Sequence, residues 1–300
     1  MPTEARSARG APRAPRISVL LPVFDAGPTL DACLRSIARQ RETDFECVLV
    51  DDGSRDESLA RARRFAAGDA RFRVIAAPHA GLVAALQRGL AHCRAPLVAR
   101  MDADDVMHRD RLALQRAALA ADPELAAVGC HVRLFPRRAL GAGMRRYEAW
   151  LASIDSPERV RAEALVECPV AHPTLLARTD LLRRFGYRET DGPEDYDLLL
   201  RMLAAGRRIG VVPRRLLAWR QHGERLSRTS ERYAIARFTA CKAEHLVRTF
   251  LARSRDYVLW GYGGTGRALA RALRDRGRHP TRIVELHPRR IGQRIQGAPV

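Results

Sequence analysis

The sequence predicts an α/β fold in which a mostly parallel sheet carries helices on both faces. Three observations lead to this prediction: strand-like and helix-like segments alternate over the first hundred residues, the strand-like segments are short apolar runs, and two of them end in clusters of Asp. This alternation is typical of parallel sheets, whose strands are buried on both faces. Ligands of such sheets bind beyond the carboxyl ends of the strands.

The first half of the chain supplies the regular part of this pattern. Apolar residues recur at helical spacing in its first expected helix, as at Leu30, Leu34 and Ile37. We expect strands at residues 17–24, 45–50, 72–76 and 96–101, and helices at residues 28–40, 57–67 and 82–93.

The second half is less regular. We expect helices at residues 109–121, 194–205 and 230–253, and strands at residues 125–135, 208–212 and 216–220, whereas residues 136–170 show no clear pattern. After residue 254 a β-α-β pattern restarts, with strands at 257–260 and 282–286. We therefore expect a disordered tail at residues 1–16, a main domain at 17–229, a connecting helix at 230–255 and a small β-α-β unit at 256–300.

The charge of the chain favours anionic small molecules or surfaces as partners. The formal net charge is +19, and Lys242 is the only Lys among 53 basic residues. The Arg residues are spread along every segment without interleaved aromatic residues, so we expect no nucleic-acid partner. Phosphorylated substrates or an anionic membrane surface fit the charge better.

The cysteines and the apolar runs indicate a cytoplasmic protein. The six Cys are widely spaced and form no C-x-x-C pair, which is typical of free thiols in a reducing compartment. No apolar run approaches the roughly 20 residues that a membrane-spanning helix needs. We expect a cytoplasmic location, with peripheral contact at the inner face of the membrane as a further expectation.

The segment Asp102-Ala103-Asp104-Asp105 is the first candidate site. Mg²⁺ and Mn²⁺ prefer carboxylate oxygens, and two Asp side chains after a strand can supply them. A calcium-binding EF-hand also begins with D-x-D, but Met107 and Ala113 stand where it needs Gly and Glu. A turn whose Asp side chains cap the next helix is the alternative that these residues alone leave open.

Two further acidic segments have both a structural and a functional interpretation. Asp51 and Asp52 end an expected strand, where they either bind a nucleotide or form a turn that caps the next helix. Glu194 and Asp195 begin an expected helix, where the helix dipole stabilises acidic residues. The functional interpretation of Asp195 is a general base that takes a proton from a sugar hydroxyl.

Taken together and in order, these segments resemble family 2 glycosyltransferases, which have the A-type glycosyltransferase fold. The resemblance covers residues 17–230. Phe24 stands where many members have Tyr, and Asp25 follows it in place of Asn. The matching segments are residues 18–24, 50–54, 81–90, 100–105, 110–112, 172–174, 194–197 and 219–222.

The resemblance implies a function and a role for particular residues. The activity is inverting transfer of a sugar from a nucleotide-diphosphate donor to the hydroxyl of a saccharide or lipid-linked acceptor, in polysaccharide or glycoconjugate biosynthesis. Pro22, Phe24 and Asp52 would hold the base and ribose, and Asp102 would contact the ribose or the metal. Asp104 would bind Mg²⁺ or Mn²⁺, Asp195 would be the catalytic base, and His222 would lie near the diphosphate, with an ordinary exposed loop residue as its alternative.

The end of the chain supports a different hypothesis. Gly261, Gly263 and Gly266 follow an expected strand and open an expected helix, which is the G-x-G-x-x-G arrangement that binds phosphate at a helix N-terminus. An NAD-dependent oxidoreductase is therefore the alternative function, although a dinucleotide site needs a larger sheet. This segment also resembles the front of the Rossmann-like domain of bacterial sugar acyltransferases, and a packing module without a ligand is its third interpretation.

Overall fold

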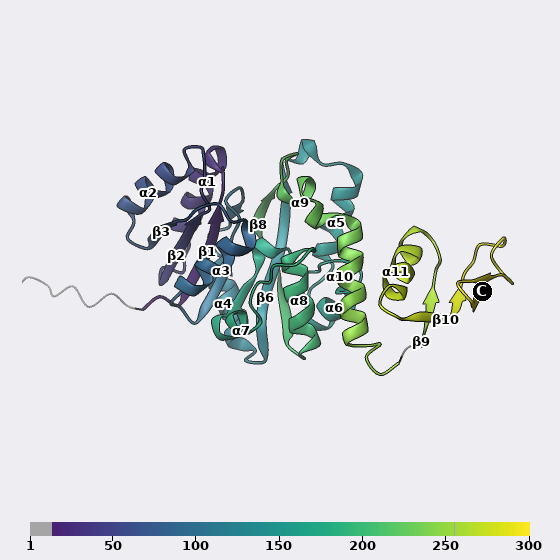
Figure 1. The fold of residues 1–300 in the computed structure, drawn as a ribbon. Helices are drawn as coiled ribbons and strands as arrows, with labels where there is room; N and C mark the ends of the chain where they lie inside the picture. Colours follow the sequence, from purple (N-terminus) through teal and green to yellow (C-terminus); the bar gives the residue numbers. More distant parts are fainter. Residues whose placement is uncertain (1–13, 255) are drawn as a thin grey trace, which may run out of the picture.

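The computed structural model describes residues 14–254 and 256–300 (Figure 1). Most of the expected N-terminal tail therefore lies outside the described residues. The main body is built on an eight-stranded sheet with the strand order β3-β2-β1-β4-β7-β6-β8-β5. Some strands that are consecutive in the sequence are neighbours in the sheet, such as β1 and β2, whereas others lie far apart, such as β4 and β5.

The first four strands confirm the predicted parallel arrangement. β1 pairs in parallel with β2 and β4, and β2 pairs in parallel with β3. Alternate residues of β1 enter two different cores, since Val19 and Leu21 pack in one cluster and Leu20 in the other. Helices therefore cover both faces. The elements are β1 (Ile17–Val23), α1 (Gly27–Ala38), β2 (Phe45–Asp51), α2 (Ser58–Gly68), β3 (Phe72–Ala76), α3 (Leu82–His92) and β4 (Leu97–Arg100).

The rest of the sheet is mixed, so the prediction of a mostly parallel sheet is wrong for this half. β7 (Leu176–Arg178) runs antiparallel to both β4 and β6 (Leu125–Phe135), and β5 (Val106–Met107) runs antiparallel to β8 (Arg208–Arg220). Among the described strands of this half, the one parallel pair is that of β6 with β8. A short apolar run does not encode its direction, because parallel and antiparallel strands have the same alternation of side chains.

Several boundaries also differ from those expected. The two strands predicted at residues 208–220 form one strand, β8, whose register with β6 shifts near Pro213. Such a bulge accommodates a Pro, which has no N–H for the ladder. The unpatterned region holds η1 (Arg137–Ala139), α5 (Ala142–Ala152) and α6 (Pro157–Glu163), followed by η2 (His172–Thr174). The remaining helices of the body are α4 (Arg111–Ala121), α7 (Thr179–Phe185) and α8 (Glu194–Ala204).

The connecting helix is shorter than expected. α9 (Leu226–Thr229) and η3 (Glu231–Tyr233) precede α10 (Ile235–Arg248), because the side chain of Ser230 accepts the N–H of Arg232 and caps a separate turn. Across residues 14–254 and 256–300, no helix is long and apolar enough to span a bilayer.

The C-terminal unit has its own two-stranded parallel sheet. Figure 1 shows it on the far side of α10 from β1, β2 and β3. α11 packs against α10 through a cluster that includes Ala243, Leu251 and Leu273. The unit contains β9 (Asp256–Trp260), α11 (Gly264–Arg274), β10 (His279–Val284), β11 (Arg294–Ile295) and β12 (Ala298–Pro299).

Candidate active site

The acidic segment after β4 forms a cluster of carboxylates. Oxygen atoms of Asp102, Asp104 and Asp105 lie within 4.8 Å of one another. Asp105 is fully buried; its Oδ1 accepts the N–H of Arg220 at 2.8 Å, whereas its Oδ2 has no hydrogen-bond partner among the described residues. Burial, and then the charge of Asp102, raises the pKa of Asp104 and of Asp105. A cluster with this excess of negative charge fits a hard divalent cation.

The loop after β8 covers this cluster. His222 places Nε2 3.0 Å from Oδ2 of Asp104, and Arg220 donates from Nε to the carbonyl oxygen of Asp104 at 2.7 Å. The pairing of β5 with β8 brings the two loops together. Arg225 lies over the ring of Trp219, and its positive charge offsets part of the rise that burial and Asp102 cause in the pKa of Asp104. His222 is therefore held at the carboxylate cluster and is not a free loop residue.

The predicted base-binding residues lie at the carboxyl ends of β1 and β2. Pro22 is buried within β1, and the Phe24 ring, which is 41% exposed, stacks on His79 with 4.2 Å between ring centroids. Asp52 is buried. Its two oxygens accept the N–H groups of Ala80 and Gly81, at 3.0 and 2.9 Å. Asp52 thus fixes the segment that leads into α3. This structural role accounts for an Asp at position 52 even where no ligand binds.

The neighbouring Asp51, which the sequence paired with Asp52, has an oxygen without a hydrogen-bond partner among the described residues. Its Oδ2 accepts the N–H of Ser54, while its buried Oδ1 has no hydrogen-bond partner in the described structure. Asp25, which replaces the usual Asn, has a φ of 45° and accepts the N–H of Arg55 at 2.7 Å. Asp tolerates this left-handed conformation well, so the replacement preserves the turn.

The second acidic pair begins α8. Burial, and then the charge of Glu194, raises the pKa of Asp195 to about 7. Oδ1 of Asp195 accepts the backbone N–H of the next residue, Tyr196, at 2.7 Å. Glu194 is buried and accepts the hydroxyl of Tyr233 at 2.7 Å. A carboxylate with a pKa near neutrality has the property that a general base needs.

Arg100 connects the two acidic groups. This buried side chain, the last residue of β4, contacts Oδ1 of Asp102 through Nη1, and its Nε has no hydrogen-bond partner in the described structure. Its positive charge also lowers the pKa of both Glu194 and Asp195. Arg100 was not among the site residues expected from the sequence. The available signal was a charged residue within the otherwise apolar run of residues 97–101.

His172 supports the second acidic pair from inside the protein. It is buried, its Nε2 lies 3.0 Å from the hydroxyl of Tyr187, and its Nδ1 lies 3.8 Å from Glu194. Burial, and then the charge of Arg100, lowers the pKa of His172 well below its usual range. The imidazole is therefore neutral and acts as a packing and hydrogen-bonding group beside Glu194.

The protein-family comparison decides the identity of this arrangement. The model of the family described as Glycosyl transferase family 2 matches residues 18–185, which hold β1, β2, β4 and the carboxylate cluster. The chain belongs to glycosyltransferase family 2. This membership confirms the family resemblance stated from the sequence motifs.

A curated relative supports the same membership. The O-antigen biosynthesis protein RfbC of Myxococcus xanthus is 33% identical over 246 residues, which is 79% of this chain and 18% of that protein. The chain thus spans less than a fifth of the length of this relative.

Solved structures of similar proteins show the A-type glycosyltransferase fold of the main body. S. aureus TarS 1-349 in complex with UDP has a TM-score of 0.61 and 18% identity, covering 86% of this chain and 70% of that one. The mannosyltransferase PcManGT from Pyrobaculum calidifontis, in complex with GDP-Man and Mn²⁺, has a TM-score of 0.57 and 21% identity, covering 91% and 72%. At these identities the similarity concerns the fold.

The Gly-rich turn of this family 2 member lies between β9 and α11 of the C-terminal unit (Figure 1). Gly261 has a φ of 88°, and a Cβ on Gly266 would lie 2.0 Å from the carbonyl oxygen of Gly261. The geometry of the turn itself therefore requires both glycines. Glu285, at the end of the next strand, accepts the N–H of Tyr262 and pairs with Arg290 at 2.7 Å, so its carboxylate is already used. This arrangement offers no support for the oxidoreductase alternative.

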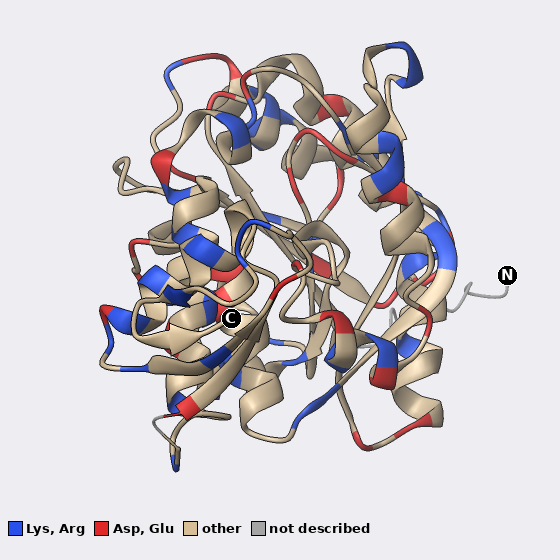
Figure 2. Ribbon diagram, turned by 90° about the vertical axis from the view of Figure 1, so that its right-hand side faces the viewer, with Lys and Arg blue, Asp and Glu red and all other residues tan. Residues whose placement is uncertain are grey.

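The basic residues of this glycosyltransferase family member are dispersed. Figure 2 shows Lys and Arg on helices and loops across the whole view, interspersed with Asp and Glu. In that view the described residues show no continuous basic stripe of the kind that follows a nucleic-acid backbone.

Proposed function

We propose that the chain is an inverting glycosyltransferase that moves a sugar from a nucleotide-diphosphate donor to an acceptor hydroxyl. The observation that carries this proposal is the link through Arg100, which contacts the carboxylate cluster at Asp102 and acts electrostatically on Asp195. One buried guanidinium thus contacts the proposed metal site and exerts its charge on the proposed base. The name of the Myxococcus relative supports a role in polysaccharide or glycoconjugate biosynthesis.

The donor would lie along the carboxyl ends of β1, β2 and β4. The exposed ring of Phe24 offers a surface for the base, beside Pro22 and Asp52. The unpartnered Oδ1 of Asp51 adds an acceptor for a base N–H or a ribose hydroxyl. The similar structures that hold UDP and GDP-Man support a nucleotide in this place.

Asp104 would hold Mg²⁺ or Mn²⁺, with Asp102 and Asp105 beside it. The fit rests on the close carboxylate oxygens and on the unpartnered buried Oδ2 of Asp105. When bound, a divalent ion supplies positive charge that neutralises the departing diphosphate. The imidazole of His222 would orient Asp104 through Oδ2.

Asp195 would accept the proton of the acceptor hydroxyl. Its Oδ1 is held by the N–H of Tyr196, which leaves Oδ2 for the acceptor. As the hydroxyl oxygen bonds to the anomeric carbon, the bond from that carbon to the diphosphate oxygen breaks, and the proton passes to Asp195. A single displacement from the opposite face inverts the anomeric configuration.

The acceptor would approach from the side of the loop before α8. This loop borders a hollow of about 550 Å³ whose lining is mainly polar and charged, which suits a saccharide or lipid-linked acceptor. The lining residues are Glu189, Thr190, Asp191, Arg232 and Arg237.

A donor screen tests the proposed function. The full chain and its Asp104→Ala variant are melted with a panel of UDP-, GDP- and TDP-sugars, each with and without Mn²⁺, and donor hydrolysis is followed in parallel. We expect one donor class to stabilise the wild type only with Mn²⁺, and Asp104→Ala to lose this effect while keeping its own melting temperature. Stabilisation by NAD(H) alone would overturn the proposed transfer, and metal-dependent donor binding that survives in Asp104→Ala would overturn the metal site at Asp104.

A further inference from the structure

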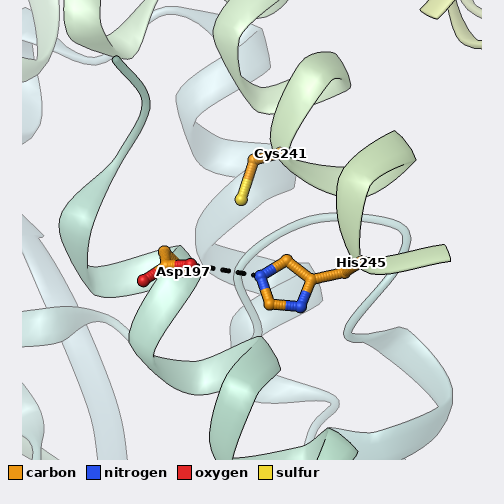
Figure 3. Close-up of side chains that lie close together, drawn as sticks. All are labelled: Asp197, Cys241 and His245. Carbon is orange, nitrogen blue, oxygen red and sulfur yellow. Dashed lines mark hydrogen bonds and ion pairs between the residues drawn. The ribbon is translucent and has the colours of Figure 1, made fainter. Parts of the chain in front are cut away.

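A second group of metal-ligating side chains lies outside the active site, between α8 and α10 (Figure 3). It consists of Asp197 on α8 and of Cys241 and His245 on α10. One ligand atom of each residue lies within 4.8 Å of those of the other two. Cys241 and His245 are four residues apart, so they project from the same face of their helix.

The carboxylate of Asp197 is already oriented toward α10. Arg201 donates from Nε to Oδ2 of Asp197 at 2.7 Å, and its Nη2 donates to the carbonyl oxygen of Gly186 at 2.7 Å. These bonds fix Oδ2, and Oδ1 faces Nε2 of His245 at 3.2 Å. Figure 3 shows the sulfur of Cys241 pointing into the same space between the helices.

We propose that Asp197, Cys241 and His245 bind a zinc ion. A thiolate, an imidazole and a carboxylate are the ligand types of tetrahedral Zn²⁺ sites, and with three protein ligands the fourth position is left to water. On binding, the thiol proton of Cys241 passes to solvent, and the ion replaces the direct contact between Asp197 and His245. The ligand set differs from the carboxylate cluster after β4, which contains oxygen ligands alone.

The zinc ion would join two helices that face different parts of the molecule. α8 begins with Glu194 and Asp195, and α10 packs on its other side against α11 of the C-terminal unit. A bond between α8 and α10 therefore stabilises the body against loss of α10. We expect sugar transfer to proceed without the ion, because none of its three ligands belongs to the proposed donor-binding or base residues.

Cobalt spectroscopy on the full chain tests this site. The protein is stripped with a chelator, kept under argon and titrated with Co²⁺, because a thiolate ligand gives a near-ultraviolet charge-transfer band that oxygen ligands do not give. We expect this band at one equivalent of Co²⁺ and its loss on addition of Zn²⁺. The band should persist in Asp104→Ala, because this substitution alters the carboxylate cluster after β4 and leaves Cys241 in place.

Two cysteine variants make the assignment specific. Cys241→Ser should abolish the band and weaken Zn²⁺ binding at least about 100-fold, since even outer residues of a metal site commonly contribute 10- to 100-fold. Cys93→Ser is the matched control, because Cys93 is buried and its thiol donates to the carbonyl oxygen of Gly89. Absence of the band in the wild type, or its persistence in Cys241→Ser, would show that Asp197 and His245 form only a direct hydrogen bond. The wild-type result stands even where a variant fails to fold.

Discussion

Nε2 of His222 lies 3.0 Å from Oδ2 of Asp104, although 118 residues separate the two. The antiparallel pairing of β5 with β8, in which Val106 lies opposite Ala218, brings their loops together. A residue near the C-terminal end of the main body thus contacts the carboxylate cluster after β4. This contact has a direct consequence for metal binding.

We predict that His222→Asn weakens the dependence of donor binding on metal without unfolding the protein. The imidazole orients Asp104, and loss of such an orienting group typically lowers metal affinity by about 10- to 100-fold. The measurement is the Mn²⁺ concentration that gives half-maximal donor hydrolysis. His108→Asn is the control, because His108 is exposed at the other end of β5. An unchanged Mn²⁺ requirement in His222→Asn would mean that His222 has no part in the metal site.

The sequence was sufficient for much of the first half of the fold because β1 and β2 are buried along their whole length. The apolar runs at β1 and β2 and the helical spacing in α1 identify these elements within two residues. β5 and β7 were not among the expected strands, because runs of two and three residues are too short to show an alternating pattern. The length of β8 was missed because Pro213 interrupts the apolar pattern without ending the strand.

The candidate site was only partly readable for a similar reason. Acidic residues at the end of a strand or the start of a helix stand out in a sequence, so Asp102, Asp104 and Asp195 could be proposed from it. Arg100 exerts its charge on Asp195, and His79 stacks on Phe24. In both cases the partner is distant in the sequence. No local pattern marks such residues, because their role arises from tertiary packing.

We predict that Asp195→Asn retains donor binding and loses transfer by a factor on the order of 10² or more, since an amide does not accept the acceptor's proton. The pH dependence of the wild type is a separate check. With a pKa of about 7, Asp195 is protonated at low pH, so the transfer rate should rise as pH increases through 7 and then level off. This rise in the transfer rate, the acidic limb of the pH profile, reports the titration of Asp195 together with Glu194, because the two charges interact. The ionisable groups around Asp195 are Glu194, Arg100, Tyr147, Cys168, Tyr187, Tyr233 and Cys241.

Initial rates from pH 5.5 to 9 at saturating donor give this profile. Asp197→Asn is unsuitable as the control because it disrupts the pair with Arg201, so Asp155→Asn, at an exposed residue outside the proposed site, is used. A rate in Asp195→Asn within a few-fold of the wild type would show that Asp195 serves only the start of α8.

We predict that Arg100→Gln moves the acidic limb of this pH profile to higher pH. The guanidinium lowers the pKa of Asp195, so its removal leaves the base protonated over a wider range. The rate at pH 7 should therefore fall more than the rate at pH 9, and Arg100→Lys should restore part of the limb. A purely structural role would lower the rate by the same factor at every pH, and that result would contradict the proposed link between Arg100 and the base.

The last prediction concerns the C-terminal unit. Of its strand residues, Leu259 and Ile283 are buried within the unit, whereas Val258 is 58% exposed. α11 covers α10 through Leu273, so deletion of residues 256–300 uncovers the apolar face formed by Ala243, Leu246 and Leu251. We expect the deletion to lower the melting temperature and the solubility, while donor hydrolysis by the soluble fraction persists, because the active-site residues lie before residue 234.

A point variant separates packing from catalysis without removing the unit. Leu273→Ala creates a cavity between α10 and α11, which typically costs about 2–5 kcal/mol, whereas Trp260→Ala changes a side chain that is 82% exposed and should cost little. Chemical denaturation monitored by tryptophan fluorescence and circular dichroism measures both, with donor hydrolysis as the second readout. Because the cluster between α10 and α11 contains none of the proposed site residues, Leu273→Ala should destabilise the protein and leave its hydrolysis rate at 20 °C unchanged. A well-folded deletion variant that no longer binds donor would instead assign residues 256–300 to the active site.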